Sequence, residues 1–294
     1  MPGAGRASDR QGALGNKDAR VDVFLVARQK RESRAKLECF RARQIKFNCD
    51  EVSAMAPCVA FLKARKLVGD GTAVFYLDKP ADFEFKAGQF ANFTLLDGTE
   101  ADPKDNTHTL SFASAPHEKN LIIAMRLRDT AFKRTLNELP IGARVLVQGP
   151  YGNLTLQNNA TRPAVFIAGG IGITPFRSMI SQATETHRTN KIFLFYSVRR
   201  AEDAAFLDEL EGMEELNPLF KCIATVTRPD LKKNGWHGET GHITRETLER
   251  WIGDLRAPIY YIAGPPTMVS GVRDMLNGAG VDDDDIRAEE FFGY

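Results

Sequence analysis

The clearest sign of chemistry in this sequence is a cluster of glycines between a predicted strand and a predicted helix. The apolar run from Ala164 to Ala168 is short enough for a strand buried on both faces. Thr174 and Pro175 favour a helix start, and between the strand and the helix lie Gly169, Gly170 and Gly172. Glycines let a backbone turn tightly and come close to a ligand, and a helix N-terminus attracts anions. A pyrophosphate suits such a site.

The same pattern has a structural alternative. A tight connection between a strand and a helix also uses glycines, without any ligand. The order Gly-Gly-x-Gly-x-Thr-Pro differs from the G-x-G-x-x-G of dinucleotide-binding turns. The rest of the chain must therefore decide between the two.

Composition narrows the class of protein. The 294 residues suffice for one or two domains with ordinary apolar and charged fractions. No apolar run approaches the ~18 residues that span a bilayer, so we expect no membrane span. The cysteines at positions 39, 49, 58 and 222 form no C-x-x-C pair, so neither a zinc nor an iron–sulfur site is visible. We expect a reducing, cytoplasmic location.

The N-terminal stretch is basic and lacks a core pattern. Residues 1–54 carry 12 Lys and Arg against 7 Asp and Glu. They could contact an acidic partner, but they lack the aromatic interleaving of nucleic-acid binders, so we expect a disordered, solvated extension and no nucleic acid. Alternatively, translation begins at Met55 and residues 1–54 are an upstream misassignment, which the intact mass of the native protein would test.

The pattern from residue 57 to residue 155 is that of an antiparallel β-barrel. About six short apolar runs are bounded by turn residues, and the first two are joined by Gly69-Asp70-Gly71, a hairpin signal. Closing into a barrel removes the sheet edges. One helix, Thr130 to Leu136 with Thr130 as N-cap, interrupts the strands.

From residue 160 to residue 294, apolar strands alternate with helical segments. The strands are AVFIA, KIFLFYS, FKCIATVT and IYYIAG, and the helices include AEDAAFLDELEGM, TRETLERWI and PTMVSGVRDMLNGAG. Alternation of this kind predicts a parallel sheet covered by helices on both faces. The glycine cluster then lies at the carboxyl end of the first strand of this α/β domain.

Eight landmarks in this order give the chain a resemblance to a known family. They are FKAGQF (85–90), LSFASAP (110–116), RDTAFKRTL (128–136), GPYGN (149–153), GGIGITP (169–175), YSVRR (196–200), AGPPTM (263–268) and the terminal EEFFGY. Across residues 57–294 the chain resembles the ferredoxin–NADP reductase superfamily. The resemblance implies an FAD-binding barrel followed by an NAD(P)-binding α/β domain.

The resemblance places the flavin ring beside the segment around Ser111, whose hydroxyl would face flavin N5. Ser111 is the serine of the family's Arg-x-Tyr-Ser motif, and His108 and Leu110 replace its arginine and its aromatic residue. The lost arginine removes a bidentate phosphate contact, which puts FAD affinity in question. The implied flavin-contacting residues here are His108, Thr109, Leu110, Ser111, Phe112, Ala113 and Ser114.

Two further flavin contacts are implied. The FAD diphosphate would lie at the N-terminus of the helix at Thr130, among Arg126, Arg128 and Lys133, which could instead form a solvated basic face. Tyr294, preceded by Phe291 and Phe292, would cover the flavin and be displaced by the nicotinamide. Ser111 and Tyr294 are thus the implied catalytic pair.

The nucleotide-binding residues implied for the α/β domain suggest a preference for NADPH over NADH. Ser197, Arg199 and Arg200 follow the second strand, where NADH-binding sheets carry an acidic residue. With Arg228, they would hold the 2′-phosphate, unless the arginines pair with nearby acids such as Glu202. The nicotinamide and pyrophosphate end would be framed by Gly169, Gly170, Gly172, Thr174, Pro175, Gly264, Pro265 and Pro266. Ala263 stands where the family often has cysteine.

The implied activity is hydride transfer from NAD(P)H to FAD, followed by electron transfer to a separate carrier such as ferredoxin or flavodoxin. The protein orients two rings and excludes water, so no acid–base triad is needed. Two alternatives stay open: the reductase component of an oxygenase, and a non-catalytic flavin- or nucleotide-binding subunit of a larger redox complex.

Overall fold

The computed structural model describes residues 56–98, 106–228 and 236–292. Residues 54–294 form one compact unit, to which all described features belong. The basic extension over residues 1–54, the start proposed at Met55 and the predicted gate at Tyr294 lie outside the described residues.

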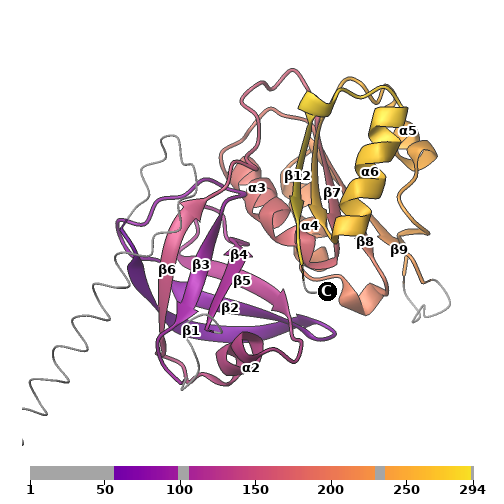
Figure 1. The fold of residues 1–294 in the computed structure, drawn as a ribbon. Coiled ribbons are helices and arrows are strands. Elements are labelled where there is room, and N and C mark those ends of the chain that lie inside the picture. The colour runs from indigo at the N-terminus through magenta and orange to yellow at the C-terminus, as the bar shows by residue number, and fades with distance from the viewer. Residues whose placement is uncertain (1–55, 99–105, 229–235, 293–294) are drawn as a thin grey trace, which may run out of the picture. The chain divides into compact units, whose positions relative to one another are not determined.

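The first half of this unit is an antiparallel sheet that closes on itself (Figure 1). Its order is β4-β3-β6-β1-β2-β5. The strands are β1 Cys58–Gly69, β2 Thr72–Asp78, β3 Phe90–Leu95, β4 Thr107–Ser111, β5 Asn120–Arg126 and β6 Arg144–Tyr151. The chain leaving β4 meets β5 because the Ala113 amide donates to the Ile122 carbonyl at 2.8 Å. The predicted antiparallel barrel is confirmed.

Period-two alternation builds the barrel core, since alternate side chains of a strand face opposite sides. In β3, for example, Ala91, Phe93 and Leu95 are buried while their neighbours are not. The helix α2, Ala131–Glu138, buries Phe132 and Leu136 against this core. Thr130 is its N-cap residue by position, as predicted, but its side chain makes no capping hydrogen bond.

The second half contains a parallel sheet with the order β10-β9-β8-β7-β11-β12. Its strands are β7 Ala164–Gly169, β8 Ile192–Val198, β9 Phe220–Val226, β10 Glu239–Thr240, β11 Ile259–Gly264 and β12 Ile286–Glu290. The sequence did not predict β12, because IRAEE is mostly polar. In the structure Ile286 is its one buried residue. It is a strand because it pairs in parallel with β11 from Tyr260 to Gly264.

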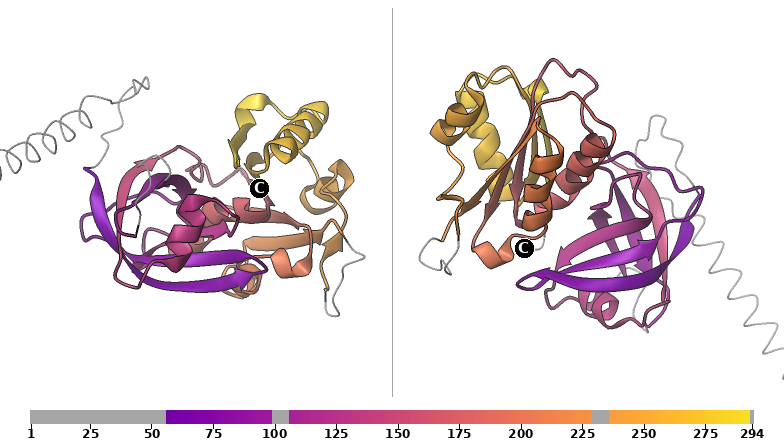
Figure 2. Two further views of the ribbon diagram at one scale, coloured as in Figure 1. Left: turned by 60° about the horizontal axis from the view of Figure 1, so that its bottom comes forward. Right: turned by 180° about the vertical axis from the view of Figure 1, so that it is seen from behind.

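Helices cover both faces of this sheet, as predicted (Figures 1 and 2). They are α3 Ile173–Glu185, α4 Leu207–Leu216, α5 Arg245–Ile252 and α6 Pro266–Gly278. Alternate residues of β7 divide between two cores: Phe166 packs in the core that α3 and α4 complete, and Ile167 in the one that α5 and α6 complete.

The helix predicted from Ala201 begins later than expected. Residues Ala201–Asp203 form a 3₁₀ turn, and Phe206 has a left-handed backbone with φ 63° before α4 starts. The turn directs the buried Asp203 carboxylate onto two arginines, an interaction that a regular helix from Ala201 does not provide by itself.

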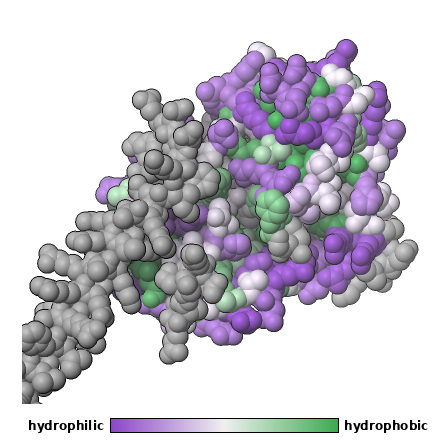
Figure 3. All heavy atoms as spheres, in the orientation of Figure 1, coloured by the Kyte–Doolittle hydropathy of each residue, from purple (hydrophilic) through white to green (hydrophobic). Residues whose placement is uncertain are grey.

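A membrane-spanning helix needs a certain length and apolar character. Within residues 56–98, 106–228 and 236–292, no helix has the length and apolar character needed to cross a bilayer. On the face drawn in Figure 3, hydrophilic residues dominate the described part and apolar ones are scattered among them.

Candidate flavin and nucleotide site

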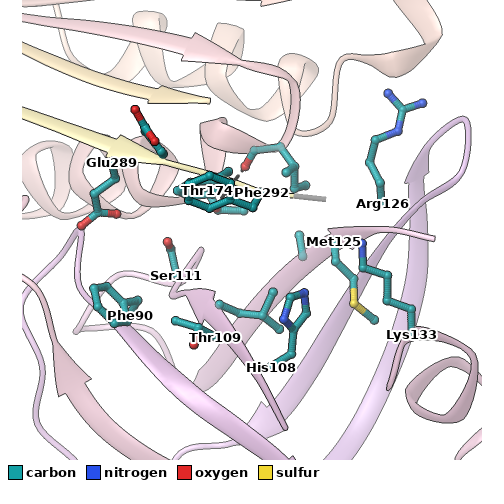
Figure 4. Close-up of a pocket in the computed structure, with 15 residues that line it drawn as sticks. Phe90, His108, Thr109, Ser111, Met125, Arg126, Lys133, Thr174, Glu289 and Phe292 are labelled. Carbon is teal, nitrogen blue, oxygen red and sulfur yellow. Dashed lines mark hydrogen bonds between the residues drawn. The ribbon is translucent and has the colours of Figure 1, made fainter. Parts of the chain in front are cut away.

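A cavity of about 360 Å³ lies where the barrel strands meet the carboxyl end of the parallel sheet. Its barrel wall comes from β3, β4, β5 and α2, and its opposite wall from the glycine turn and β12 (Figure 4). The lining residues are Phe90, His108, Thr109, Leu110, Ser111, Ala124, Met125, Arg126, Lys133, Ile171, Thr174, Glu289, Glu290, Phe291 and Phe292. An apolar pocket with a few polar groups from two directions suits an aromatic ligand carrying charge at one end.

Lys133 and Arg126 supply that charge, at one end of the cavity (Figure 4). Lys133 is only 8% exposed, and its ammonium has no hydrogen bond or ion pair within the described part of the chain. Burial first, and then the charge of Arg128, lower the pKa of Lys133. The first turn of α2 carries no acidic residue and no side-chain cap. A cation that faces the cavity without a partner among the described residues, beside an open helix N-terminus, favours an anion.

His108 does not provide this charge. It lies on β4 rather than in a loop, with its ring edge-on to Phe132 at a centroid distance of 5.3 Å. Burial, and then the charge of Lys133, hold the pKa of His108 below its usual value. A neutral imidazole is therefore the favoured state near neutral pH, so His108 does not replace the charge of the motif arginine.

The segment after Ser111 divides between cavity and core. Ser111, 6% exposed, lines the cavity. Phe112 is instead fully buried in the barrel core, where its ring lies 4.4 Å from that of Phe85. Ala113 and Ser114 are also fully buried and do not line the cavity. The side chains expected beside the flavin thus end at Ser111, because the chain turns inward to close the barrel.

The glycine turn brings its neighbours together differently from the prediction. A Cβ on Gly172 would lie 2.2 Å from the Ala263 carbonyl oxygen, and one on Gly169 would lie 2.4 Å from the Met268 sulfur. The chain's own backbone and side chains therefore occupy the Cβ side of these two glycines, so packing alone requires glycine at both positions. Gly170, with φ 51°, makes the turn itself.

Ile171 and Thr174 are the residues of this segment that line the cavity, whereas Pro175 is buried within α3 and does not line it. The turn and the segment after β11 are adjacent, as the sequence predicted. A Cβ added to Gly264 would lie 3.1 Å from the Gly169 backbone. Pro265 is the N-cap residue of α6, and Pro266 is its first residue.

Glu289 is a site residue for which the sequence led to no assigned role. Its carboxyl lines the cavity at the end opposite Lys133, near Phe90 (Figure 4). Burial raises its pKa to about 7. The only signal in the sequence was the acidic pair in the terminal EEFFGY. Because β12 was not predicted, the sequence could not show that Glu289 faces the cavity. Phe291, two residues after Glu289, donates its amide to the Gly264 carbonyl at 2.8 Å, while Phe292 is 75% exposed.

A second, smaller cavity of about 220 Å³ brings together the three arginines of the predicted 2′-phosphate site, but Ser197 does not line it. It is lined by Arg126, Arg128, Arg199, Arg200, Asp203 and Arg228. β8 and β9 end side by side there, with the Arg228 amide donating to the Arg199 carbonyl at 3.0 Å. Ser197 lies on β8, paired with Gly169 of β7. The arginines that line this cavity come from both halves of the unit and outnumber its single carboxylate, Asp203, so the local charge favours an anion.

Arg200 is not free for a ligand in this arrangement. It donates to Asp203 at 2.9 Å and to Asp70 of the β1–β2 hairpin at 2.6 Å. Arg126 binds the same Asp203 at 2.9 Å. The alternative that this arginine pairs with nearby acids therefore holds for Arg200, whereas Arg199 and Arg228 are exposed and have no ion pair within the described residues.

Comparisons with known proteins agree with this geometry. A family model described as an oxidoreductase NAD-binding domain matches residues 166–274. One subunit of the Na⁺-translocating NADH-quinone reductase from Klebsiella pneumoniae is 28% identical over 236 residues, 75% of this chain and 57% of its own. The reductase subunit of glycine betaine monooxygenase from Chromohalobacter salexigens is 28% identical over 221 residues, 75% of this chain and 60% of its own. The chain thus spans less than two thirds of either relative.

Among solved structures, a ferredoxin NADP⁺ reductase from Neisseria gonorrhoeae with bound FAD and NADP has a TM-score of 0.67 at 21% identity. The match covers 80% of this chain and 99% of that one. At this identity it establishes the two-domain fold.

Proposed function

We propose, on the premise that this chain belongs to the ferredoxin–NADP reductase superfamily, that it is an FAD-dependent oxidoreductase. It takes a hydride from a nicotinamide nucleotide, with NADPH favoured, and passes electrons to a separate carrier. The observation that carries the proposal is the Lys133 ammonium, which has no partner among the described residues and faces a cavity that the glycine turn closes from the other side.

The residues present fit a flavin nucleotide. Lys133 and the uncapped N-terminus of α2 would hold its phosphates, replacing the arginine that β4 lacks. The apolar walls from Leu110, Ala124 and Met125 suit an aromatic ring system. When bound, a flavin accepts a hydride and gives up electrons singly or in pairs.

The chain's own side chains orient and protect the reaction. The Ser111 hydroxyl, which can donate or accept, lies on the barrel wall, and Thr174 lies on the nucleotide wall. Phe291 and Phe292 add apolar surface that excludes water. The Glu289 carboxyl, with its pKa near 7, can hold or release a proton at its side-chain oxygen at physiological pH.

The preference for NADPH rests on Arg199 and Arg228. Both are exposed at the carboxyl ends of neighbouring strands, where a bidentate guanidinium contact suits a 2′-phosphate. Arg200 takes no part in this contact because two carboxylates already hold it.

The electron acceptor is a separate protein. Ferredoxin or flavodoxin is one candidate. The likeness to a monooxygenase reductase subunit favours an oxygenase component as the second.

The first experiment is a visible spectrum of the purified protein before and after anaerobic addition of NADPH, with NADH in parallel. Bands near ~370 and ~450 nm that bleach faster with NADPH support flavin binding, hydride transfer and the nucleotide preference together. Faster bleaching with NADH overturns only the preference. A colourless protein that stays inert with added FAD overturns the enzyme and supports the non-catalytic alternative.

Substitution of Lys133 tests the phosphate site separately. We expect Lys133→Met to weaken FAD binding by about tenfold or more, because a charge-assisted hydrogen bond contributes roughly 1.5–3 kcal/mol. Arg134→Gln is the matched control, since Arg134 is the next residue on α2 but is exposed and paired with Asp129. Titration of the apoprotein with FAD, followed by flavin fluorescence, measures both variants. Equal affinities for the two variants would refute the role of Lys133.

A further inference from the structure

Arg177 of α3 is the most completely bonded charged side chain outside the cavities, among the residues that the structure describes. It is 7% exposed and holds Glu118 of the barrel by two hydrogen bonds, of 2.7 and 3.1 Å. It also binds Glu209 of α4 and donates to the Ala113 carbonyl at 2.8 Å. One guanidinium therefore joins three groups from two halves of the unit.

Arg177 connects the segments that form the two walls of the larger cavity. It lies one helical turn after Thr174, which lines the cavity. Its partner Ala113 lies two residues after Ser111, on the opposite wall. The next helix residue, Ser178, donates to the Ser114 carbonyl at 2.6 Å. Both walls of the cavity are thus anchored to each other through adjacent residues of α3.

The barrel side of this contact is itself held in shape. The Ala113 amide bonds Ile122 of β5, and the Ile122 amide bonds the Ser114 hydroxyl at 3.0 Å. Glu118 also accepts from the Ala115 amide, so it holds the backbone next to the Ala113 carbonyl that Arg177 binds. A shift of Arg177 would therefore move the segment that follows Ser111 as a body.

Only an arginine can serve all of these partners. Its planar fork presents five donors in fixed directions, whereas a lysine ammonium is a point charge at the end of a flexible stem. The Arg177 guanidinium also lies over the Phe206 ring, 5.5 Å from its centroid, which adds a cation–π contact. Lysine would keep the charge but lose the simultaneous contacts with Ala113 and both carboxylates.

We propose that Arg177 is a positioning residue that sets the separation of the Ser111 wall from the Thr174 wall, and hence the alignment of the hydride donor with its acceptor. This inference rests on the proposed function. Displacements of about 1 Å can slow a reaction by about 10²-fold without contact between the changed residue and the substrate. Arg177 lines neither described cavity, so its effect is on alignment rather than on binding.

Arg162 provides a matched control. It too forms a two-bond ion pair, with Asp285 at 2.7 Å, and it donates to two carbonyls, those of Ala257 and Pro258. All of these partners lie in the second half of the unit. Arg162→Lys therefore removes a comparable set of bonds without changing the contact between the two cavity walls, and it controls for a general loss of stability.

The experiment compares Arg177→Lys, Glu118→Gln and Arg162→Lys with the unsubstituted full chain, each loaded with FAD. Anaerobic stopped-flow mixing with NADPH gives the limiting rate of flavin reduction and the apparent nucleotide Kd. We expect Arg177→Lys to lower the limiting rate at least tenfold with Kd changed less than threefold, Glu118→Gln to lower it less, and Arg162→Lys to change neither.

Hydrogen exchange of the FAD-free proteins adds a readout that needs no activity. The peptide covering residues 112–118 should exchange faster in Arg177→Lys and unchanged in Arg162→Lys. If the unsubstituted chain is not reduced at all, the proposed function falls and the positioning role falls with it. If that chain is reduced and Arg177→Lys keeps its limiting rate, or loses only nucleotide affinity, the positioning role alone is refuted.

Discussion

At the scale of single residues, the proposed flavin site takes its positive charge from a different element than in the resembling family. The strand position that carries arginine in the resembling family holds His108, whose pKa burial lowers. In the proposed site, Lys133 of α2, which lines the same cavity, would supply the cation instead. The attraction between a cation and a phosphate depends on their distance in space, so a residue of another element can supply the same charge.

Glu289 allows a pH test at this scale. Burial raises its pKa to about 7, so between roughly pH 4.3 and 7 the folded chain holds a proton that the unfolded chain has lost. Stability from this group is therefore present at low pH and is lost as pH rises towards 7. We expect Glu289→Gln to stabilise the protein by about 1–3 kcal/mol at pH 8, and by close to nothing at pH 4.5.

Urea unfolding at the two pH values measures this difference. Glu290→Gln is the control, since Glu290 is the next residue of β12 and lines the same cavity while being exposed. The assignment fails if the stability gain of Glu289→Gln is the same at both pH values, or if Glu290→Gln shows the same trend.

At the scale of elements, the glycine turn is primarily a packing device. The backbone at Ala263 and the side chain of Met268 occupy the space beside Gly172 and Gly169. This contact seats the start of α3 against the end of β11 and so directs Thr174 into the cavity. The glycines therefore act on the cavity indirectly, because they place the helix that lines it.

Two glycine substitutions separate this packing from general helix propensity. A Cβ at position 172 would meet the Ala263 backbone, which cannot move aside like a flexible side chain. We expect Gly172→Ala to destabilise the protein by about 1–3 kcal/mol. Gly271 lies inside α6 with nothing within 4 Å of its Cβ position, so Gly271→Ala should stabilise by roughly 0.5–1 kcal/mol. Denaturant midpoints decide, and a shift of the same sign in both variants contradicts this account.

At the scale of the whole unit, arginine-centred clusters tie the barrel to the parallel sheet. One is Arg177 with its two glutamates. The other joins Arg126 and Asp70 of the barrel to Arg200 and Asp203. In the second cluster the hairpin tip also docks by backbone, with the Asp70 amide donating to the Glu202 carbonyl at 2.8 Å.

Asp203 carries a prediction at this scale. Burial alone would raise its pKa, but hydrogen bonds from Arg200 and the charge of Arg126 hold it below the usual value. Its stabilisation is therefore present above the ordinary Asp pKa and is lost as pH falls through the lowered one. We expect Asp203→Ala to cost about 1–3 kcal/mol at pH 7, because it leaves two guanidinium groups without their buried partner.

Asp283→Ala is the comparison for this measurement. Asp283 is 61% exposed in its pair with Arg273, and exposed pairs contribute about 0–1 kcal/mol. Chemical unfolding at pH 7 and below pH ~3 separates the two variants. An Asp203→Ala loss as small as that of Asp283→Ala would show that this cluster does not stabilise the unit.

The sequence by itself determined the two-part architecture, because period-two runs in the first half and strand–helix alternation in the second are local properties. It also identified Ser111, Lys133, Thr174 and the arginines after β8 and β9 as candidates. Tertiary structure alone decided which of them share a cavity, since that depends on contacts between distant segments. In the folded chain Phe112 lies in the core, Arg200 pairs with Asp70 and Asp203, and Glu289 lies near Phe90. Burial and pairing, which set charge and pKa, arise only when the chain folds.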